Sequence, residues 1–88
     1  MKLRDTVAQM CSDDYKDRFV AEYKQTKVRY ERLKNLNTRI TAADECPEKV
    51  EKPQHDCPVF LLQEQENTMR HYLHILEIRA VIEGIDLE

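Results

Sequence analysis

Proline and glycine occur at only a few positions in this 88-residue chain, and those positions limit the folds that it can adopt. All three prolines lie between Pro47 and Pro58, and the single glycine is Gly84. Proline removes a backbone donor and interrupts helices, whereas glycine commonly follows the last helical turn. Residues 13–43 and 58–83 are therefore two long stretches without an internal helix breaker, and both are rich in residues that favour helix.

These stretches predict an all-α protein, an antiparallel two-helix hairpin. The apolar residues Leu3, Val7 and Met10 follow helical spacing and predict a short N-terminal helix before the hairpin. A chain of this length holds one domain at most. The predicted elements of this single helical-hairpin domain, residues 1–88, are a short helix over 3–10, a long helix over 13–43, a connection over 44–57 and a long helix over 58–83.

Apolar side chains recur along both long stretches at steps of three and four residues, which predicts the faces that meet. Asn37 interrupts the first of these stripes, and a polar residue in such a position is expected to fix the register of the two helices. The first stripe comprises Phe19, Tyr23, Thr26, Tyr30, Leu33, Asn37 and Ile40, and the second comprises Leu62, Gln65, Met69, Tyr72, Leu73, Leu76 and Ala80.

The second helix carries a further apolar stripe, Ile75, Ile78, Ile82 and Ile85, about 100° around its axis from the first. One partner helix cannot cover both stripes, and contiguous exposed apolar surface usually marks an interface. A lone hairpin of this size would also be marginally stable. We therefore predict that the chain self-associates through these isoleucines into an oligomeric helical bundle. Alternatively, or in addition, the N-terminal segment, Leu3 to Met10, folds back and covers them.

Composition and charge exclude several classes of protein. No stretch approaches the roughly 20 apolar residues that span a bilayer, and the first residues lack the apolar core of a signal peptide. Three cysteines, an odd number, do not suit a secreted disulfide framework. We expect a cytoplasmic protein with free thiols and no membrane association.

The charge is distributed unevenly along the chain. Residues 16–39 carry eight basic and three acidic side chains, whereas residues 45–88 carry four basic and ten acidic ones. The net charge of −3 disfavours binding to duplex DNA, where many phosphates must be neutralised. The basic half could instead attract a small anion.

Basic and aromatic side chains alternate along the first helix, and this is the pattern most suggestive of function. Tyrosine rings stack on nucleobases, and lysine or arginine binds phosphate. The alternative is that the tyrosines belong to the helix seam and that the basic side chains merely flank it. The predicted ligand-binding residues are Tyr15, Lys16, Arg18, Tyr23, Lys27 and Tyr30.

Other chemistry is only weakly indicated. The loop residues Cys46, His55 and Cys57 do not have the spacing of a zinc site, and neither do the helical His71 and His74. Cys57 with His55 is the only local nucleophile–base pair, and a hairpin offers no deep pocket for catalysis. We therefore expect no enzymatic activity, no metal site and no cofactor.

Residues 57–87 also carry a distinctive pattern that resembles a known family. The pattern consists of Cys57-Pro58, Leu61-Leu62, Gln65, Met69, Tyr72-Leu73, Ile75-Leu76, Arg79-Ala80 and Ile82-Glu83-Gly84-Ile85. It resembles the end of short proteins common in crAss-like and other tailed phages, and residues 23–33 resemble the first helix of that family.

The three-segment layout and the Cys57-Pro58 pair are more loosely similar to phage hairpin proteins that counter the CBASS and Thoeris defence systems. That resemblance implies an oligomer in the host cytoplasm that holds a cyclic nucleotide between subunits without converting it. It assigns no ligand-binding residue in this chain. The alternative function is a helical-hairpin module that binds a host or phage protein through the isoleucine stripe.

Overall fold

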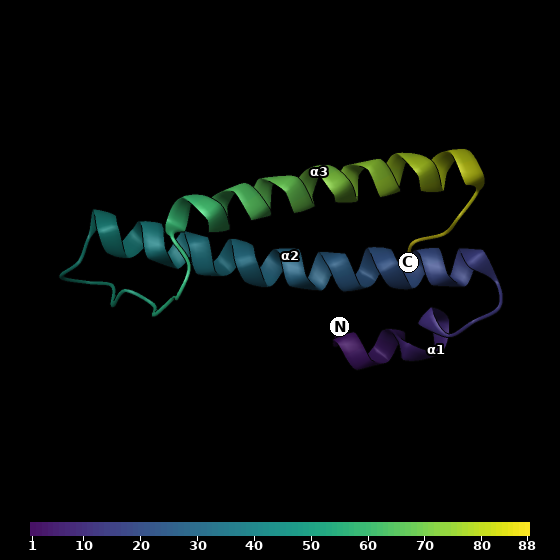
Figure 1. Ribbon diagram of the computed structural model, residues 1–88, viewed down its shortest axis with the longest axis horizontal. Coiled ribbons are helices and arrows are strands. Elements are labelled where there is room, and N and C mark those ends of the chain that lie inside the picture. The colour runs from purple at the N-terminus through teal and green to yellow at the C-terminus, as the bar shows by residue number, and fades with distance from the viewer.

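The computed structural model describes all 88 residues and contains helices but no strands. Helices α2 and α3 run antiparallel, side by side along the long axis of a rod (Figure 1) whose principal extents are 51, 25 and 20 Å. The predicted all-helical hairpin is thus confirmed. None of the helices is both long enough and apolar enough to cross a membrane. The elements are a 3₁₀ turn, η1 (Leu3–Thr6), and three α-helices, α1 (Val7–Met10), α2 (Tyr15–Glu45) and α3 (Val59–Glu83).

Local hydrogen bonds set both ends of α2. The Asp14 carboxylate accepts from the backbone N–H of Lys16 at 3.0 Å and so caps the first turn, where free N–H groups and the helix dipole favour an acid. At the other end, the Cys46 N–H donates to the carbonyl of Ala42 at 2.9 Å. Pro47 follows directly and cannot continue the helix.

Proline and glycine set the ends of α3. Pro58 is the N-cap residue, and its carbonyl accepts from the backbone N–H groups of Leu61 and Leu62. Gly84 follows the last turn with a φ of +68°, a left-handed conformation that glycine adopts without steric cost. The N–H of Ile85 then donates to the carbonyl of Ala80 at 2.8 Å, which turns the chain back towards α2.

The main hydrophobic cluster lies between α2 and α3, towards the end of the rod where α2 begins, and Ile40 and Ala43 are buried nearer the other end of α2. The predicted seam residues Phe19 and Tyr23 are buried in the main cluster, while Tyr30 is half-buried against the same cluster. Tyr72, which the sequence pattern also placed on the contact face, is 39% exposed. The buried cluster comprises Phe19, Val20, Tyr23, Leu73, Leu76, Ala80 and Ile85.

Asn37 on α2 forms hydrogen bonds with α3 further along the hairpin. Its buried side-chain amide donates to the carbonyl of Leu62 at 3.1 Å and to the carboxylate of Glu66 at 2.9 Å. A buried amide loses both bonds if α3 slides by one turn, and leaving it unpaired is unfavourable. These contacts fit the register role expected for Asn37.

The isoleucine stripe is exposed except for its last member. Ile75 and Ile78 are 40% and 47% exposed, and Ile82 is 76% exposed. Ile85 is only 9% exposed, so its assignment to an outer interface is wrong. The helical spacing ends at Gly84, and the left-handed turn there carries Ile85 into the core instead of around α3.

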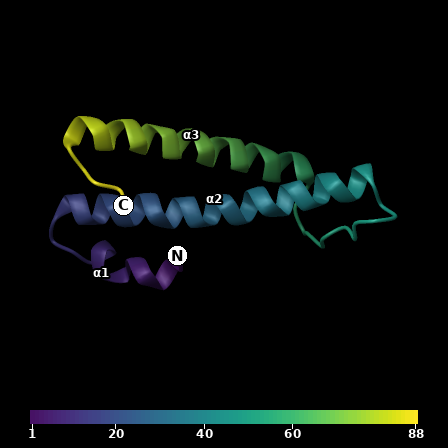
Figure 2. The same cartoon turned by 180° about the vertical axis from the view of Figure 1, so that it is seen from behind.

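The N-terminal segment does not cover the isoleucines. η1 and α1 contact α2 alone, and they lie on the side of α2 away from α3 (Figures 1 and 2). The side chain of Gln25 on α2 donates to the hydroxyl of the fully buried Thr6 at 2.7 Å. The alternative that residues 3–10 shield the outer face of α3 is therefore wrong.

Candidate ligand-binding site

The six residues predicted to bind a ligand divide into two groups along α2. In the first group, the Tyr15 hydroxyl donates to Glu83 at 3.2 Å and the Arg18 guanidinium donates to the carbonyl of Ser12 at 2.7 Å. These bonds tie the start of α2 to the end of α3 and to the preceding loop, and no cavity is lined by this group. The first group comprises Tyr15, Lys16 and Arg18, and the second comprises Tyr23, Lys27 and Tyr30.

The second group lines a cavity of about 290 Å³ between α2 and α3. The α3 residues that complete this cavity were not among the predicted site residues. Arg70, His74 and Glu77 are spaced by four and three residues, which places a cation, an imidazole and a carboxylate on one face of α3. This face can be recognised as part of a site only when the register of the two helices is known. The α3 residues are Arg70, Leu73, His74 and Glu77.

Tyr23 connects this cavity to the core. The side chain is 7% exposed, and its hydroxyl donates to the Glu77 carboxylate at 2.6 Å. Burial, followed by this hydrogen bond, raises the pKa of Tyr23 to about 12, so the phenol stays protonated at neutral pH. Because most of the ring packs in the core, the half-buried Tyr30 offers the more accessible aromatic surface.

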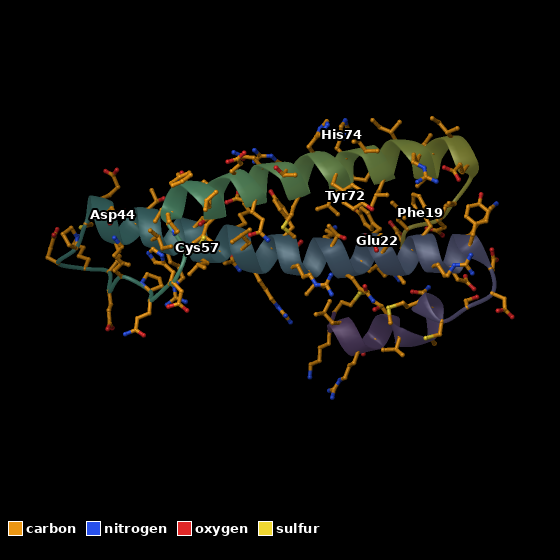
Figure 3. The ribbon with its side chains drawn as sticks, viewed as in Figure 1. Phe19, Glu22, Asp44, Cys57, Tyr72 and His74 are labelled. Atoms are coloured by element: carbon orange, nitrogen blue, oxygen red, sulfur yellow. The ribbon has the colours of Figure 1, made fainter.

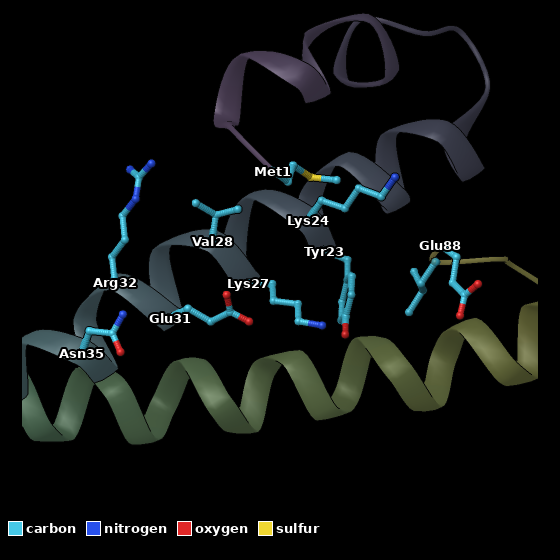
Figure 4. Close-up of a pocket in the computed structure, with 10 residues that line it drawn as sticks. Met1, Tyr23, Lys24, Lys27, Val28, Glu31, Arg32, Asn35 and Glu88 are labelled. Atoms are coloured by element: carbon cyan, nitrogen blue, oxygen red, sulfur yellow. The ribbon is translucent and has the colours of Figure 1, made fainter. Parts of the chain in front are cut away.

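A larger cavity of about 530 Å³ adjoins the other side of Tyr23 and Lys27 (Figure 4). Its floor is one face of α2, and its walls come from the two ends of the chain. Because the two cavities share Tyr23 and Lys27, we refer to them together as the Lys27 groove. The larger cavity is lined by Met1, Tyr23, Lys24, Lys27, Val28, Glu31, Arg32, Asn35, Leu87 and Glu88.

The Lys27 groove contains basic side chains that form no ion pair within the protein and could bind an anion. Lys24, Lys27, Arg32 and Arg70 line it, and none of them forms an ion pair within 4.0 Å. The Lys27 ammonium lies 5.8 Å from the centre of the Tyr23 ring, close enough for a cation–π interaction. The groove therefore combines aromatic surface and unpaired basic side chains with three carboxylates, those of Glu31, Glu77 and Glu88.

The opposite side of the hairpin has a similar composition, but its groups are paired with one another. The Arg79 guanidinium lies 4.8 Å from the centre of the Phe19 ring and donates to Glu83 at 2.8 Å. This hydrogen bond lowers the pKa of the Glu83 carboxyl. The Tyr72 hydroxyl donates to Glu22 at 3.2 Å in the space between the helices (Figure 3). These contacts hold the two helices together and leave little capacity for a ligand.

The cysteines and histidines are not grouped as the ligands of a metal ion. The Cys46 thiol donates to Glu48 at 2.8 Å, and this bond raises the pKa of the thiol, which disfavours a reactive thiolate. The His55 Nδ1 atom lies 2.7 Å from the carbonyl of Cys57. No group of three or more His, Cys, Asp or Glu side chains is close enough to hold a metal ion.

A family model described as Sequestin matches residues 13–82, which include α2 and nearly all of α3. The chain belongs to the Sequestin family. No curated protein and no solved structure matches it. The family name is consistent with sequestration of a signal molecule, a binding role rather than a catalytic one. The part of this Sequestin that the family model covers includes all six predicted ligand-binding residues, the floor of the Lys27 groove and the exposed isoleucines.

Proposed function

We propose that this protein is a phage-encoded sponge that binds a cyclic nucleotide immune signal and withholds it from a host defence system without converting it. The observation that carries the proposal is the Lys27 groove, where unpaired basic side chains adjoin tyrosine rings on a chain of the Sequestin family. Phosphates would bind to Lys27 and its basic neighbours, and a base would stack on Tyr30.

We further propose that the sponge acts as an oligomer and that the groove is closed at a subunit boundary. Ile75, Ile78 and Ile82 form an exposed apolar stripe on α3, and the neighbouring Val81 is 84% exposed. A second copy that covered this stripe would remove apolar surface from water, which favours association. Two ion pairs lie beside the stripe, Arg79 with Glu83 and His74 with Glu77, and both form within one chain.

The exposed stripe also supports a second candidate function, a module that binds a host or phage protein. In that case Ile78 would contact the partner protein, and the charge of the Lys27 groove would have little effect on its binding. The two functions therefore differ in the expected effect of Lys27→Ala. This substitution should abolish the activity of a sponge and should leave that of a protein-binding module nearly unchanged.

A ligand screen with two matched variants tests the proposal. Light scattering after size exclusion would give the subunit number, and thermal shift with cyclic di- and trinucleotides and cyclic ADP-ribose isomers would identify a ligand. A ligand at 100 times its Kd stabilises the folded state by about 2.7 kcal/mol, which a thermal shift detects readily. The bound nucleotide should be recovered intact after denaturation of the protein.

Lys27→Ala should abolish the thermal shift, whereas Lys34→Ala, an exposed lysine of α2 that lines no cavity, should retain it. Ile78→Glu should break the oligomer. An oligomer that shows no shift with any of these nucleotides would contradict the sponge function and favour the protein-binding module. A stable monomer would contradict the oligomeric site.

A further inference from the structure

Residues 84–88 cross from the end of α3 back to α2 and form one wall of the larger cavity. The turn at Gly84 starts the crossing, and the buried Ile85 anchors it in the core. Leu87 packs against the same core cluster, and Leu87 and Glu88 then line the cavity (Figure 4). The position of this wall is therefore fixed by packing rather than by charge.

The wall and the floor of this cavity differ in their relation to the family. The floor residues, from Tyr23 to Asn35, lie inside the segment that the Sequestin model matches. Leu87 and Glu88 lie beyond residue 82, where the match ends. The matched segment thus supplies the floor, with three basic side chains and Glu31, whereas residues 84–88 supply a wall that carries a further carboxylate.

The larger cavity is lined by two acidic residues, Glu31 on its floor and Glu88 on its wall, and Glu88 is the one that residues 84–88 contribute. Its carboxylate forms no ion pair within 4.0 Å, so no cation of the protein neutralises it directly. Lys24, Lys27 and Arg32 line the same cavity. A ligand phosphate bound to these cations would be repelled by Glu88, and the repulsion grows with the number of charges on the ligand.

We propose that residues 84–88 act as a specificity-determining wall, in which Glu88 lowers the affinity of the groove for highly charged anions relative to less charged ones. For nucleotides, the wall would favour a ligand with few phosphates over one with more. That part rests on the proposed function. The preference for less charged anions applies to any anion that enters the cavity, whether or not it is a nucleotide.

The test compares Glu88→Gln with Asp86→Asn. Asp86 belongs to the same wall segment and carries the same charge, but it lines no cavity, and asparagine keeps an oxygen that can accept from the Glu88 N–H. Calorimetry at low ionic strength would measure binding of sulfate, tripolyphosphate, cyclic di-adenylate and cyclic tri-adenylate to both variants and to the unchanged chain.

We expect Glu88→Gln to bind tripolyphosphate and cyclic tri-adenylate about three- to tenfold more tightly. Sulfate and cyclic di-adenylate should gain less, and Asp86→Asn should change every affinity by less than about twofold because its charge lies outside the cavity. Equal effects of the two variants, or no effect of either, would overturn the proposed role of Glu88 in specificity. The sponge function would still stand in that case if Lys27→Ala abolished nucleotide binding. If tripolyphosphate responded to Glu88→Gln but no nucleotide bound, the wall would stand and the sponge function would fail.

Discussion

The Tyr23 hydroxyl on α2 donates a hydrogen bond of 2.6 Å to the Glu77 carboxylate on α3, the shortest of three tyrosine–glutamate bonds between the α2 and α3 helices. Tyr23 is at once a core residue and a lining residue of the Lys27 groove. A change at this side chain therefore affects both folding and the candidate site, whereas Lys27 affects the site alone.

We predict that Tyr23→Phe lowers the free energy of unfolding by about 1 kcal/mol. The substitution removes one hydrogen bond, and part of the loss is recovered because the exposed Glu77 carboxylate regains water. Urea unfolding followed by circular dichroism measures the change. The matched control is Tyr72→Phe, which removes a 3.2 Å bond from a side chain that is 39% exposed and should cost about 0.5 kcal/mol or less. Equal losses in the two variants would contradict the special role of Tyr23.

The Tyr23 phenol should also make stability depend on pH in the alkaline range. Burial and the bond to Glu77 raise its pKa from 10.0 to about 12 in the folded state. The folded protein thus holds this proton more tightly than the unfolded chain, so the contribution is complete below pH 10 and is lost as the pH rises towards 12. The free energy of unfolding, measured between these pH values, should fall more steeply with pH for the unchanged chain than for Tyr23→Phe. Parallel curves would show that Tyr23 ionises normally.

Ile85 and Ile82 should differ strongly in how much the same truncation destabilises the fold. Ile85→Ala removes a buried side chain from the core and should destabilise the fold by about 2–4 kcal/mol. Ile82 is 76% exposed, so Ile82→Ala should change the stability of a single chain by about 0.5 kcal/mol or less. If self-association buries Ile82, the effect of its truncation should grow with protein concentration. Unfolding at two concentrations separates these contributions.

Gly84→Ala should destabilise the fold by about 1 kcal/mol through the backbone alone. Gly84 has a φ of +68°, which disfavours residues with a Cβ, and a methyl group there would meet no other atom within 4 Å. Gly84→Asn should cost less, because asparagine tolerates the left-handed region better than alanine does. Thermal unfolding of the two variants checks the order, and a larger loss for asparagine would contradict it.

The hairpin could be predicted from the sequence because its breakers are few and its apolar spacing is regular. Pro47, Pro58 and Gly84 mark where helices end, and these signals act within a few residues of the chain. Ile85 could not be placed in this way, since helical spacing says nothing about a side chain that follows a left-handed turn. The wrong assignment arose from extending a periodic pattern past the residue that ends it.

The candidate site was only partly visible in the sequence. The spacing along one helix placed Tyr23, Lys27 and Tyr30 together, because neighbours on a helix face are set by its geometry. The same reasoning added Tyr15, but its bond to Glu83 depends on where α3 ends. Residues contributed by α3 and by the two ends of the chain depend on register and on a chain reversal, which local patterns do not specify.

Because η1 and α1 pack on one side of α2 and α3 packs on the other, α2 is the middle layer of the molecule, and it is the only helix that α3 contacts (Figure 2). Transient detachment of α3 breaks fewer contacts than release of α2, and segments with fewer contacts open at lower free energy. In hydrogen exchange the amides of α3 should therefore lose their protection before those of α2, and a protein or nucleotide that holds α3 in place would slow that exchange most.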